Sequence, residues 1–304
     1  MRRKHGFIGG DMDKLTIGFI GLGVMGEPMC RNIMAKSGHK VKVFDLDAAP
    51  VQRLASLGAE AAADVGSLLS GCDVVLVSLP SGKVLLELAH AGGLLAHMGK
   101  GQIFVDLGTS AVKLTRELAV EFAARGVRYL DAPVARTRQA AEAGTLSIMV
   151  GGDAATFEEI RPILACCASD ITHCGAIGSG QVTKILNNMV LFQTVAALSE
   201  AYAIAHHAGF DPKLIFDTLS KGSGDSFALR NHGAKAIIPQ VFPPRAFSVE
   251  YAKKDLSYAL ELAADYGIDA AGARRVDALF EQAIAKGLGE PYFPVVSKIL
   301  DGTA

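Results

Sequence analysis

The sequence predicts an α/β fold in which a doubly wound parallel sheet is followed by an all-helical C-terminal domain. Two observations carry this prediction. Short apolar runs rich in β-branched residues alternate with helical stretches up to about residue 178, and from there the pattern is helical almost to the end. Such an alternation is typical of a parallel sheet with helices on both faces. At 304 residues, 50% of them hydrophobic, the chain is long enough for two domains.

The expected strands begin after a short leading segment. Residues 1–13 carry charge but lack the apolar core of a signal peptide, and we expect them to form a disordered tail. The expected strands are LTIGFI (15–20), KVKVFD (40–45), DVVLVSL (73–79), QIFVDL (102–107), VRYLDAPV (127–134) and TLSIMVGG (145–152). We place the domain boundary within GAIGSG, so that residues 14–178 form the α/β domain and residues 179–304 the helical domain.

The composition favours a small-molecule partner. Thirty Lys and Arg against thirty-one Asp and Glu give a formal net charge of −1, so no strong field draws the chain to nucleic acid or to a membrane surface. The longest apolar segment, residues 189–205, is interrupted by polar side chains and is too short for a membrane span. We expect a buried helix there.

The cysteines and histidines predict neither disulfides nor a metal site. The five cysteines include no CxxC pair, which indicates reduced thiols and a cytoplasmic location. The eight histidines lack HxxxH or HxH spacing. The adjacent His206 and His207 are expected to point about 100° apart on a helix.

A glycine-rich loop follows the first expected strand. Gly21, Gly23 and Gly26 form a GxGxxG array at the start of a helix. In a Rossmann-type dinucleotide site, the first glycine makes a tight turn, the second lets backbone approach a pyrophosphate, and the third allows helix and strand to pack closely. We expect the whole loop to bind cofactor, including the residues between the glycines, which are Leu22, Val24 and Met25.

The second expected strand ends on Asp45, nineteen residues beyond Gly26. An acidic side chain at this place accepts hydrogen bonds from the adenosine ribose hydroxyls and repels a 2′-phosphate, so NAD is favoured over NADP. Arg53 lies downstream and could pair with a phosphate, which keeps NADP possible. The alternative is a glycine turn between packed elements with an incidental aspartate.

Five further segments follow the glycine loop in order: SLP (78–80), DLGTS (106–110), DAPVART (131–137), GQVTKILNN (180–188) and KKDL (253–256). Together with GFIGLGVMGEPM, they make the chain resemble the β-hydroxyacid dehydrogenase family from residue 14 to about residue 300. The ordered set is far more specific than any one motif. The resemblance implies an NAD(P)-dependent oxidoreductase.

By this resemblance, residues of both domains surround the cofactor. Leu79 and Pro80 lie under it, and Thr109 touches its nicotinamide end. From the helical domain, Lys254 lies near the cofactor with Phe247 packed beside it. The positions of SLP and DLGTS agree with this, because open α/β sheets bind ligands at the carboxyl ends of their strands. Taken without the resemblance, these are ordinary loop residues and a solvated helix face.

Lys184 is the catalytic residue that the resemblance implies. It shares a polar stripe of a helix with Asn188, just after the domain boundary, where clefts form. From the segment alone, a lysine that extends its ammonium to solvent is the more usual explanation. In the implied role, Lys184 donates a proton to the oxyanion on reduction and removes it on oxidation. Asn188 and Asp255 would contact the substrate.

The residues after DAPV depart from the family pattern. Most relatives carry Ser-Gly-Gly, which holds the substrate carboxylate, where this chain has Ala135, Arg136 and Thr137. The planar fork of Arg136 suits a carboxylate or a sulfonate. A similar Arg-Thr pair occurs in sulfolactaldehyde reductases of the same superfamily. In the other interpretation, Arg136 points outward and only backbone amides bind the anion.

We therefore expect a hydride transfer between nicotinamide and the terminal alcohol or semialdehyde of a short 3-hydroxy acid. The types expected are 3-hydroxyisobutyrate dehydrogenase and 2-hydroxy-3-oxopropionate reductase. A sulfolactaldehyde-type reductase is the alternative, and a non-catalytic NAD-binding module is a further one. The apolar surface of the helical domain predicts a homodimer or homotetramer.

Overall fold

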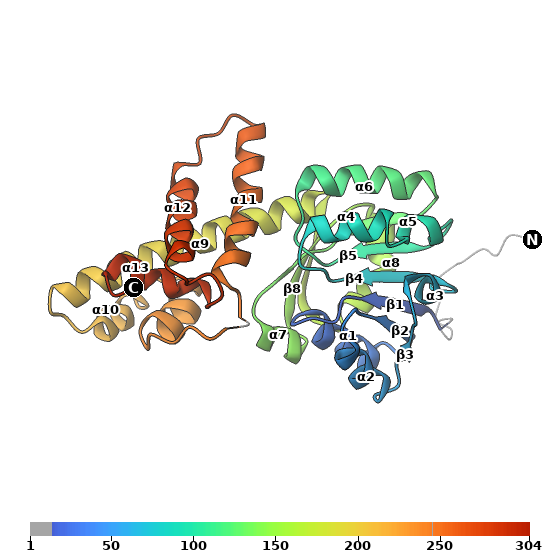
Figure 1. Cartoon of the computed structure of the whole chain (residues 1–304), viewed down its shortest axis with the longest axis horizontal. Coiled ribbons are helices and arrows are strands. Elements are labelled where there is room, and N and C mark those ends of the chain that lie inside the picture. Colours follow the sequence, from blue (N-terminus) through green and yellow to red (C-terminus); the bar gives the residue numbers. More distant parts are fainter. Residues whose placement is uncertain (1–13, 245) are drawn as a thin grey trace, which may run out of the picture.

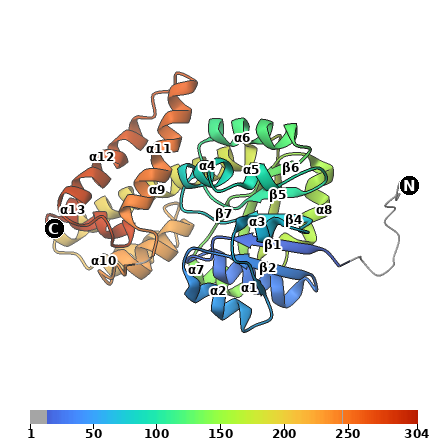
Figure 2. The ribbon, with the colours of Figure 1, turned by 45° about the vertical axis from the view of Figure 1, so that its right-hand side comes forward.

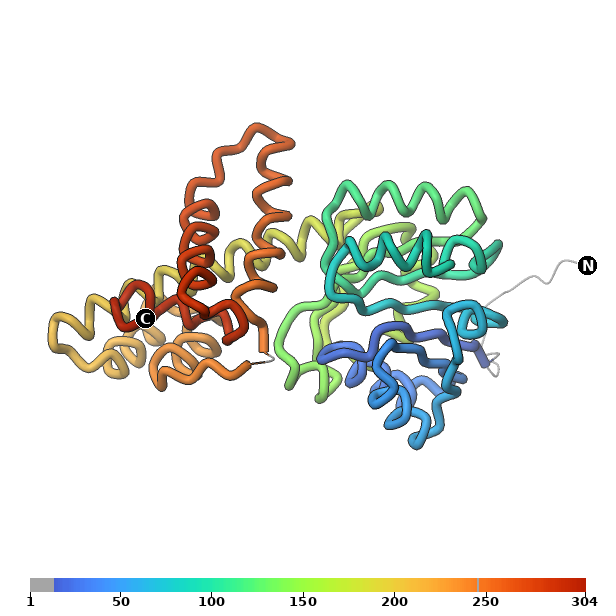
Figure 3. Tube along the Cα trace, in the orientation of Figure 1, coloured from blue at the N-terminus to red at the C-terminus, as the bar shows by residue number. Residues whose placement is uncertain are grey.

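The computed structural model describes residues 14–244 and 246–304, so the tail expected at residues 1–13 lies outside the described residues. The chain forms an α/β lobe and a helical lobe (Figure 1). Helix α9 (Ser179–His207) begins within the first lobe and runs through the second. Figure 3 traces this helix from the edge of the sheet to the far end of the molecule.

The α/β lobe is built on a nine-stranded sheet with the order β3-β2-β1-β4-β5-β6-β8-β7, and β9 pairs with β8. The strands are β1 (Thr16–Ile20), β2 (Lys40–Phe44), β3 (Glu60–Ala61), β4 (Val74–Val77), β5 (Ile103–Asp106), β6 (Arg128–Asp131), β7 (Val134–Ala135), β8 (Leu146–Gly151) and β9 (Ala168–Gly175). Each expected apolar run contains a strand, but the run 127–134, expected as one strand, is divided into β6 and the start of β7. The two-residue strands β3 and β7 are too short to produce a detectable period.

The sheet is parallel from β3 to β6, which confirms the predicted doubly wound parallel sheet, and it is mixed at one edge. Strand β8 runs antiparallel to β6 and β7. Two consecutive strands can run parallel only if a crossover of about a dozen residues or more carries the chain back to the edge where the first strand began. Only the short helix α7 (Arg138–Ala143) lies between β7 and β8, so the chain turns back as a hairpin. Strand β9, which follows the longer helix α8 (Ala154–Leu164), is again parallel to β8.

Alternating side chains of the central strands build one apolar core on each face of the sheet. Ile17 and Phe19 of β1 belong to one core, while Val75 and Val77 of β4 belong to the other. The first face is covered by α1 (Gly26–Lys36), α2 (Ala48–Ala55), α7 and α8. The second is covered by α3 (Val65–Leu69), α4 (Gly82–His90), α5 (Leu94–His97) and α6 (Val112–Ala124). Figure 2 shows helices on both sides of the sheet.

The helical lobe packs around α9. It contains α10 (Pro212–Leu219), a π-helix (Leu229–Ile237), α11 (Val249–Asp265), α12 (Ala271–Ala285), a 3₁₀ turn (Phe293–Val295) and α13 (Val296–Asp301). At its centre the ring of Phe192 lies 5.5 Å from Phe247, 5.5 Å from Phe280 and 5.1 Å from Phe293. The apolar segment 189–205 is therefore the middle of α9. None of the helices within the described ranges is long and apolar enough to cross a membrane.

Candidate active site

The glycine loop joins β1 to α1 at the carboxyl edge of the sheet. Gly21 has φ +88°, and a Cβ on it would overlap the carbonyl oxygen of Ser78. A Cβ on Gly26 would overlap the carbonyl oxygen of Gly21. The turn and the close packing of α1 thus require glycine at both positions. A Cβ on Gly23, in contrast, would meet no atom within 4 Å.

The open position of Gly23 lies at the N-terminus of α1. Among the described residues, no side chain caps this helix, because Met25 at the N-cap position makes no capping hydrogen bond. Val24 is 46% exposed, whereas Leu22 is buried in the sheet core. The helix therefore presents backbone N–H groups and its positive dipole end beside open space, an arrangement that fits a pyrophosphate.

Asp45 lies directly after β2 and is tied to the glycine loop. Its Oδ2 accepts a hydrogen bond from the N–H of Leu22 at 2.5 Å, and its Oδ1 accepts one from the N–H of Asp47 at 2.8 Å. The carboxylate is partly exposed. Asp45 therefore lies beside the glycine loop, and each of its carboxylate oxygens accepts one backbone N–H.

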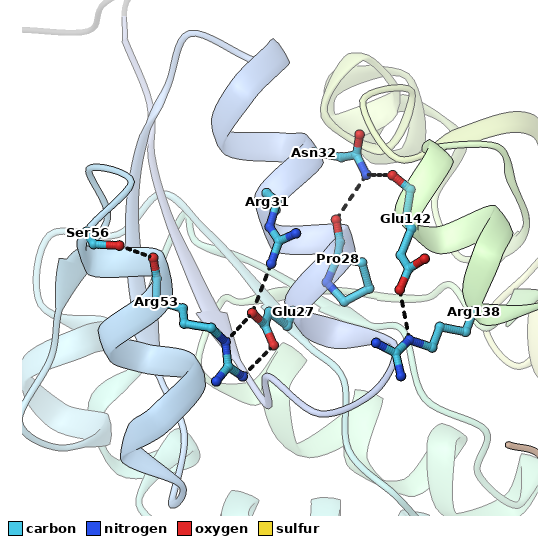
Figure 4. Close-up of polar contacts among 8 residues, drawn as sticks. All are labelled: Glu27, Pro28, Arg31, Asn32, Arg53, Ser56, Arg138 and Glu142. Atoms are coloured by element: carbon cyan, nitrogen blue, oxygen red, sulfur yellow. Dashed lines mark hydrogen bonds and ion pairs between the residues drawn. The ribbon is translucent and has the colours of Figure 1, made fainter. Parts of the chain in front are cut away.

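Arg53 of α2, the other residue that the sequence suggested for the adenosine end, is bonded to protein. Its Nε and Nη2 donate to the two carboxylate oxygens of Glu27, each at 2.8 Å. Arg31 donates to the same carboxylate at 3.0 Å. Figure 4 shows both guanidinium groups turned toward Glu27.

The loops after β4 and β5 lie beside the glycine loop at the same edge. Leu79 is half-buried and Thr109 is buried, while Pro80 is exposed. The ammonium of Lys254, from α11, donates to the carbonyl oxygen of Pro80 at 2.9 Å and lies 3.8 Å from the ring centre of Tyr251. This contact brings the helical lobe against the cofactor edge of the sheet.

Phe247 lies just before α11 and packs inward. Its ring lies 5.5 Å from those of Phe192, Tyr251 and Phe293. Through Tyr251, it supports the surface on which the ammonium of Lys254 rests. These contacts place Phe247 beneath the α11 wall of the site.

The N-terminus of α9 is bound to the ends of β5 and β6 by residues that the sequence reasoning did not single out. Asp131, at the end of β6, is fully buried and accepts the backbone N–H of Gly178 at 2.7 Å and of Gln181 at 2.8 Å. The buried side chain of Gln181 accepts the N–H of Ser110 at 3.0 Å and donates to the carbonyl of Gly108 at 2.9 Å. The sequence offered only an aspartate at a strand end, because its partners Gly178 and Gln181 lie about fifty residues later in the chain.

Asp106, at the end of β5, is a second buried carboxylate in this junction. It accepts the N–H of Gly108 at 2.9 Å, and its neighbour on β6 is Asp131. Burial, opposed by the hydrogen bond from Gly108 and reinforced by the charge of Asp131, raises the pKa of Asp106 to about 7. Burial also raises the pKa of Asp131, against the lowering effect of the backbone N–H groups that it accepts.

Lys184, Asn188 and Asp255 come together between α9 and α11. Asn188 and Asp255 are each 1% exposed, and the amide of Asn188 donates to Asp255 Oδ2 at 2.7 Å. Asp255 Oδ1 lies 2.9 Å from the ammonium of Lys254. Lys184 lies one turn before Asn188 and is 8% exposed. It is therefore not a lysine that extends into solvent.

Burial lowers the pKa of Lys184. The negative charge of Asp255 opposes this shift, and the positive charge of Lys254 adds to it. Both charges come from α11, so the helical lobe tunes the ammonium as well as enclosing it. A lysine with a lowered pKa releases its proton more readily near neutral pH.

Arg136 does not present a free guanidinium. Its Nη1 donates to the carbonyl of Thr145 at 2.6 Å and to Ser169 Oγ at 2.8 Å, and its Nη2 donates to Asp170 at 2.8 Å. Its backbone has φ +87°, in the left-handed region that favours glycine. This geometry explains why a glycine suits the position and supports the outward-pointing interpretation.

The residues on either side of Arg136 serve the local fold. Ala135 is buried in β7, where it pairs with Ser147 of β8. Thr137 is the N-cap of α7, and its hydroxyl accepts the N–H of Ala140 at 3.4 Å. Neither side chain has a hydrogen bond to α9 or α11 among the described residues.

The two histidines at the end of α9 do not diverge as expected. His206 Nδ1 lies 2.8 Å from Asp301 Oδ1, and His207 Nε2 lies 3.0 Å from the carbonyl of Asp301. In the described part of the chain, this is the group of His, Cys, Asp and Glu residues whose ligand atoms are close enough to hold a metal. The hydrogen bonds of both histidines to Asp301 account for this arrangement, because they join the end of α9 to α13.

Comparisons with known proteins agree with this architecture. Residues 16–175 match a family model described as the NAD binding domain of 6-phosphogluconate dehydrogenase. Residues 178–293 match one described as NAD-binding of NADP-dependent 3-hydroxyisobutyrate dehydrogenase. A solved structure of Mycobacterium tuberculosis 3-hydroxyisobutyrate dehydrogenase with L-serine superposes with a TM-score of 0.86 at 31% identity, over 94% of this chain and 99% of that chain.

Two relatives illustrate the similarity in sequence. A 3-hydroxyisobutyrate dehydrogenase from Pseudomonas aeruginosa is 38% identical over 251 residues, which cover 80% of this chain and 84% of the relative. A 2-(hydroxymethyl)glutarate dehydrogenase from Eubacterium barkeri is 34% identical over 286 residues, or 94% of each chain. With two family models matched in order along the chain, this protein belongs to the β-hydroxyacid dehydrogenase family, whose members are NAD(P)-dependent oxidoreductases acting on CH–OH groups.

Proposed function

We propose that this enzyme interconverts the terminal alcohol of a short 3-hydroxy acid and its semialdehyde, with Lys184 as the group that exchanges the proton. The observation that carries the proposal is the burial of Lys184 near the hydrogen-bonded pair of Asn188 and Asp255. Relatives named 3-hydroxyisobutyrate dehydrogenase and 2-hydroxy-3-oxopropionate reductase support this substrate class.

The glycine loop, Asp45, Leu79, Pro80 and Thr109 would hold the dinucleotide along the carboxyl edge of the sheet. When bound, its nicotinamide supplies the hydride for reduction or accepts it on oxidation. Asp45 supports a preference for NAD, because its carboxylate can accept from a ribose hydroxyl and would repel a 2′-phosphate.

Lys184 has the properties that a proton donor and acceptor needs. Reduction of a carbonyl leaves charge on oxygen unless a proton reaches that oxygen, and alcohol oxidation requires the reverse. Burial weakens the hold of Lys184 on its proton, which suits both directions. Because α9 is bonded to β5 and β6 through Gln181 and Asp131, the position of Lys184 relative to the sheet edge is fixed.

Asn188 and Asp255 would orient the substrate. The Asn188 amide has a second N–H besides the one given to Asp255, and this donor suits a substrate hydroxyl or carboxylate. Asp255 holds the amide of Asn188 by its Oδ2 and faces the ammonium of Lys254 by its Oδ1. Because Lys254 also donates to the carbonyl of Pro80, this polar network reaches from the helical lobe to the α/β lobe.

A sulfolactaldehyde-type activity has less support. That alternative rests on Arg136, and the guanidinium of Arg136 is occupied by Thr145, Ser169 and Asp170. If the anionic end of the substrate lies near this turn, backbone N–H groups would receive it. The relatives that carry glycine there are expected to bind in the same way.

We further propose a homodimer or homotetramer in the cytoplasm. Apolar side chains lie exposed along α9, with Leu186 at 42%, Val190 at 59% and Ile204 at 70%. Covering these side chains by a second copy would remove apolar surface from water. The cytoplasmic location is proposed from the sequence, whose cysteines include no CxxC pair.

The decisive experiment replaces Lys184 by Met, which keeps the length of the side chain without the ammonium. We expect kcat to fall by about 10²–10⁴-fold, the usual worth of general acid–base assistance, with the Kd for NAD(H) within about twofold of the wild type. Oxidation rates of the wild type should also rise with pH through an apparent pKa below the value of about 10.4 for a free lysine.

Lys253→Met is the matched control, because Lys253 lies on α11 with its ammonium bonded to Asp277 and Glu281 on α12. It should retain kcat. A panel of hydroxyisobutyrate, glycerate, threonate, serine and sulfolactate, each offered with NAD and NADP, identifies the substrate. Retention of a third of kcat in Lys184→Met would show that Lys184 is structural.

A further inference from the structure

Glu27 and two arginines form an ion-pair cluster next to the glycine loop. Glu27 is the second residue of α1 and its side chain is 15% exposed, whereas the side chains of Arg53 and Arg31 are 55% and 52% exposed. Arg53 holds both carboxylate oxygens of Glu27 as a fork, and Arg31 adds a third hydrogen bond. Figure 4 shows Arg53 reaching across from α2 to α1.

This cluster occupies the corner where the adenosine end of the cofactor is expected. The N–H of Glu27 donates to the carbonyl of Gly23, so Glu27 lies one helical turn beyond the open position of the loop. Asp45, which holds the N–H of Leu22, is separated from the start of α2 by two residues. Arg53 points from α2 back toward this corner.

The charges of the corner favour a cofactor without a 2′-phosphate. Glu27, Asp45 and Asp47 supply three carboxylates against the two arginines, and both arginines are already bonded to Glu27. A bidentate arginine fork is a strong ligand for a phosphate, so Arg53 would be a natural partner for NADP if it were released. Glu27 already accepts the Nε and Nη2 donors of Arg53 that a 2′-phosphate would need.

We infer that Glu27 is a specificity-determining residue, which favours NAD(H) over NADP(H) by holding Arg53 away from the position of a 2′-phosphate. This inference rests on the proposed NAD preference at Asp45. Asp45 opposes the phosphate directly by its charge, whereas Glu27 acts by occupying the cation that would otherwise attract it. The two residues therefore make separable contributions.

The ion pairs also indicate that Arg53, rather than Glu27, would move if the pairing were broken. The pKa of Glu27 is lowered, above all by its hydrogen bonds from Arg53, so this carboxylate stays ionised at neutral pH. Neutralising Glu27 while keeping its shape removes the carboxylate charge that Arg53 binds as a fork, and only the more distant charge of Asp47 remains beside it. The long, half-exposed side chain of Arg53 can then reorient.

The test measures binding of 5′-ADP and 2′,5′-ADP by calorimetry, since these probes report the adenosine end without nicotinamide or turnover. In Glu27→Gln, the ratio of the Kd for 2′,5′-ADP to the Kd for 5′-ADP should fall by about tenfold, the worth of one charge-assisted contact. The double variant Glu27→Gln/Arg53→Ala should return the ratio to the wild-type value. Arg53→Ala alone should leave the ratio within about twofold.

Glu159→Gln is the control, because Glu159 pairs in the same two-pronged way with Arg128 elsewhere on the surface. It should not change the ratio. A ratio within twofold of the wild type in Glu27→Gln, in folded protein by circular dichroism, overturns the inference. So does a double variant that keeps the full gain, because Arg53 would then have no part in it.

Failure of the underlying cofactor proposal would appear differently. A wild-type enzyme that already prefers 2′,5′-ADP by tenfold contradicts the NAD preference itself, whatever the variants do. A wild type that prefers 5′-ADP, with variants that leave this preference unchanged, would sustain the role of Asp45 and reject that of Glu27.

Discussion

Two helix N-termini lie at the carboxyl edge of the same sheet, and they satisfy their backbone N–H groups in opposite ways. At α1, no side chain caps the helix, and a Cβ at Gly23 would meet no atom within 4 Å. At α9, the carboxylate of Asp131 accepts the N–H groups of Gly178 and Gln181. Both termini favour negative charge because of the helix dipole and the unpaired donors of the first turn.

The difference teaches where the protein is preformed and where it depends on a ligand. Asp131 is a built-in anion, so α9 and its Lys184 are fixed to the sheet in the folded chain. The anion that suits α1 is the cofactor pyrophosphate, and the one acidic side chain in its first turn, Glu27, is turned toward Arg53 and Arg31. The start of α9, which carries Lys184, is therefore held by contacts within the folded chain, whereas the start of α1 is left to be stabilised by the ligand that we propose for it.

Removing the built-in anion should have the largest effect on stability. Asp131→Asn leaves one of the two buried N–H groups without an acceptor and removes the charge at the dipole end, so the free energy of unfolding should fall by about 2–4 kcal/mol. Urea denaturation measures the loss. Asp153→Asn, at the exposed N-cap of α8, should lose only a few tenths of a kcal/mol. Equal losses in the two variants would refute the role of Asp131 as a buried anchor.

Closing the open terminus should instead affect binding. In Gly23→Val, the new Cβ has no atom of the described residues within 4 Å, so the thermal stability of the free enzyme should hardly change. Its Kd for NAD(H) should rise by about 100-fold, or about 2.7 kcal/mol. We expect saturating cofactor to raise the Tm of the wild type, because ligand binding stabilises the state that binds it, and we expect this rise to be lost in Gly23→Val.

Gly99→Val is the control for this prediction, because Gly99 also has no neighbour within 4 Å of a Cβ and lies in a turn away from the glycine loop. It should keep the cofactor-dependent rise in Tm. Unchanged NAD(H) binding in Gly23→Val would mean that the pyrophosphate does not approach α1.

The N-terminus of α7, at the same edge of the sheet, adds a third case to the comparison. There we expect the smallest effect on stability and on KM. The short helix α7 is capped by its own Thr137, and Arg136 before it is bonded to Asp170. Arg136→Gly removes an exposed ion pair worth about 0–1 kcal/mol and relieves a left-handed backbone, so stability should stay within about 1 kcal/mol of the wild type. The KM for the best hydroxy acid should stay within about twofold.

Asp170→Asn provides the comparison for Arg136→Gly, because it breaks the same ion pair without changing the backbone. The stability difference between the two variants reports the backbone strain at residue 136. A tenfold rise in KM in Arg136→Gly alone would restore the interpretation that Arg136 binds the substrate anion, and with it the sulfonate alternative.

The fold could be predicted closely because its signals are local. Apolar runs and helical periods indicated the strands β1, β2, β4, β5, β6 and β8, as well as the change to an all-helical pattern at α9. The sequence pattern does not show the antiparallel direction of β8, and the two-residue strands β3 and β7 are too short to produce a period. A strand's direction depends on the path of its connection, which periodicity does not contain.

The candidate site divides in the same way. By itself, the sequence determined the glycine array, the acidic end of β2 and the place of a lysine just after the strands end, because these depend on residue order and spacing along one element. Only the tertiary structure decided that Asn188 meets Asp255, that Asp131 holds the start of α9, and that Arg136 is bonded away. Those contacts join side chains from elements far apart in the chain, so they depend on sheet register and helix packing, which no local pattern of residues records.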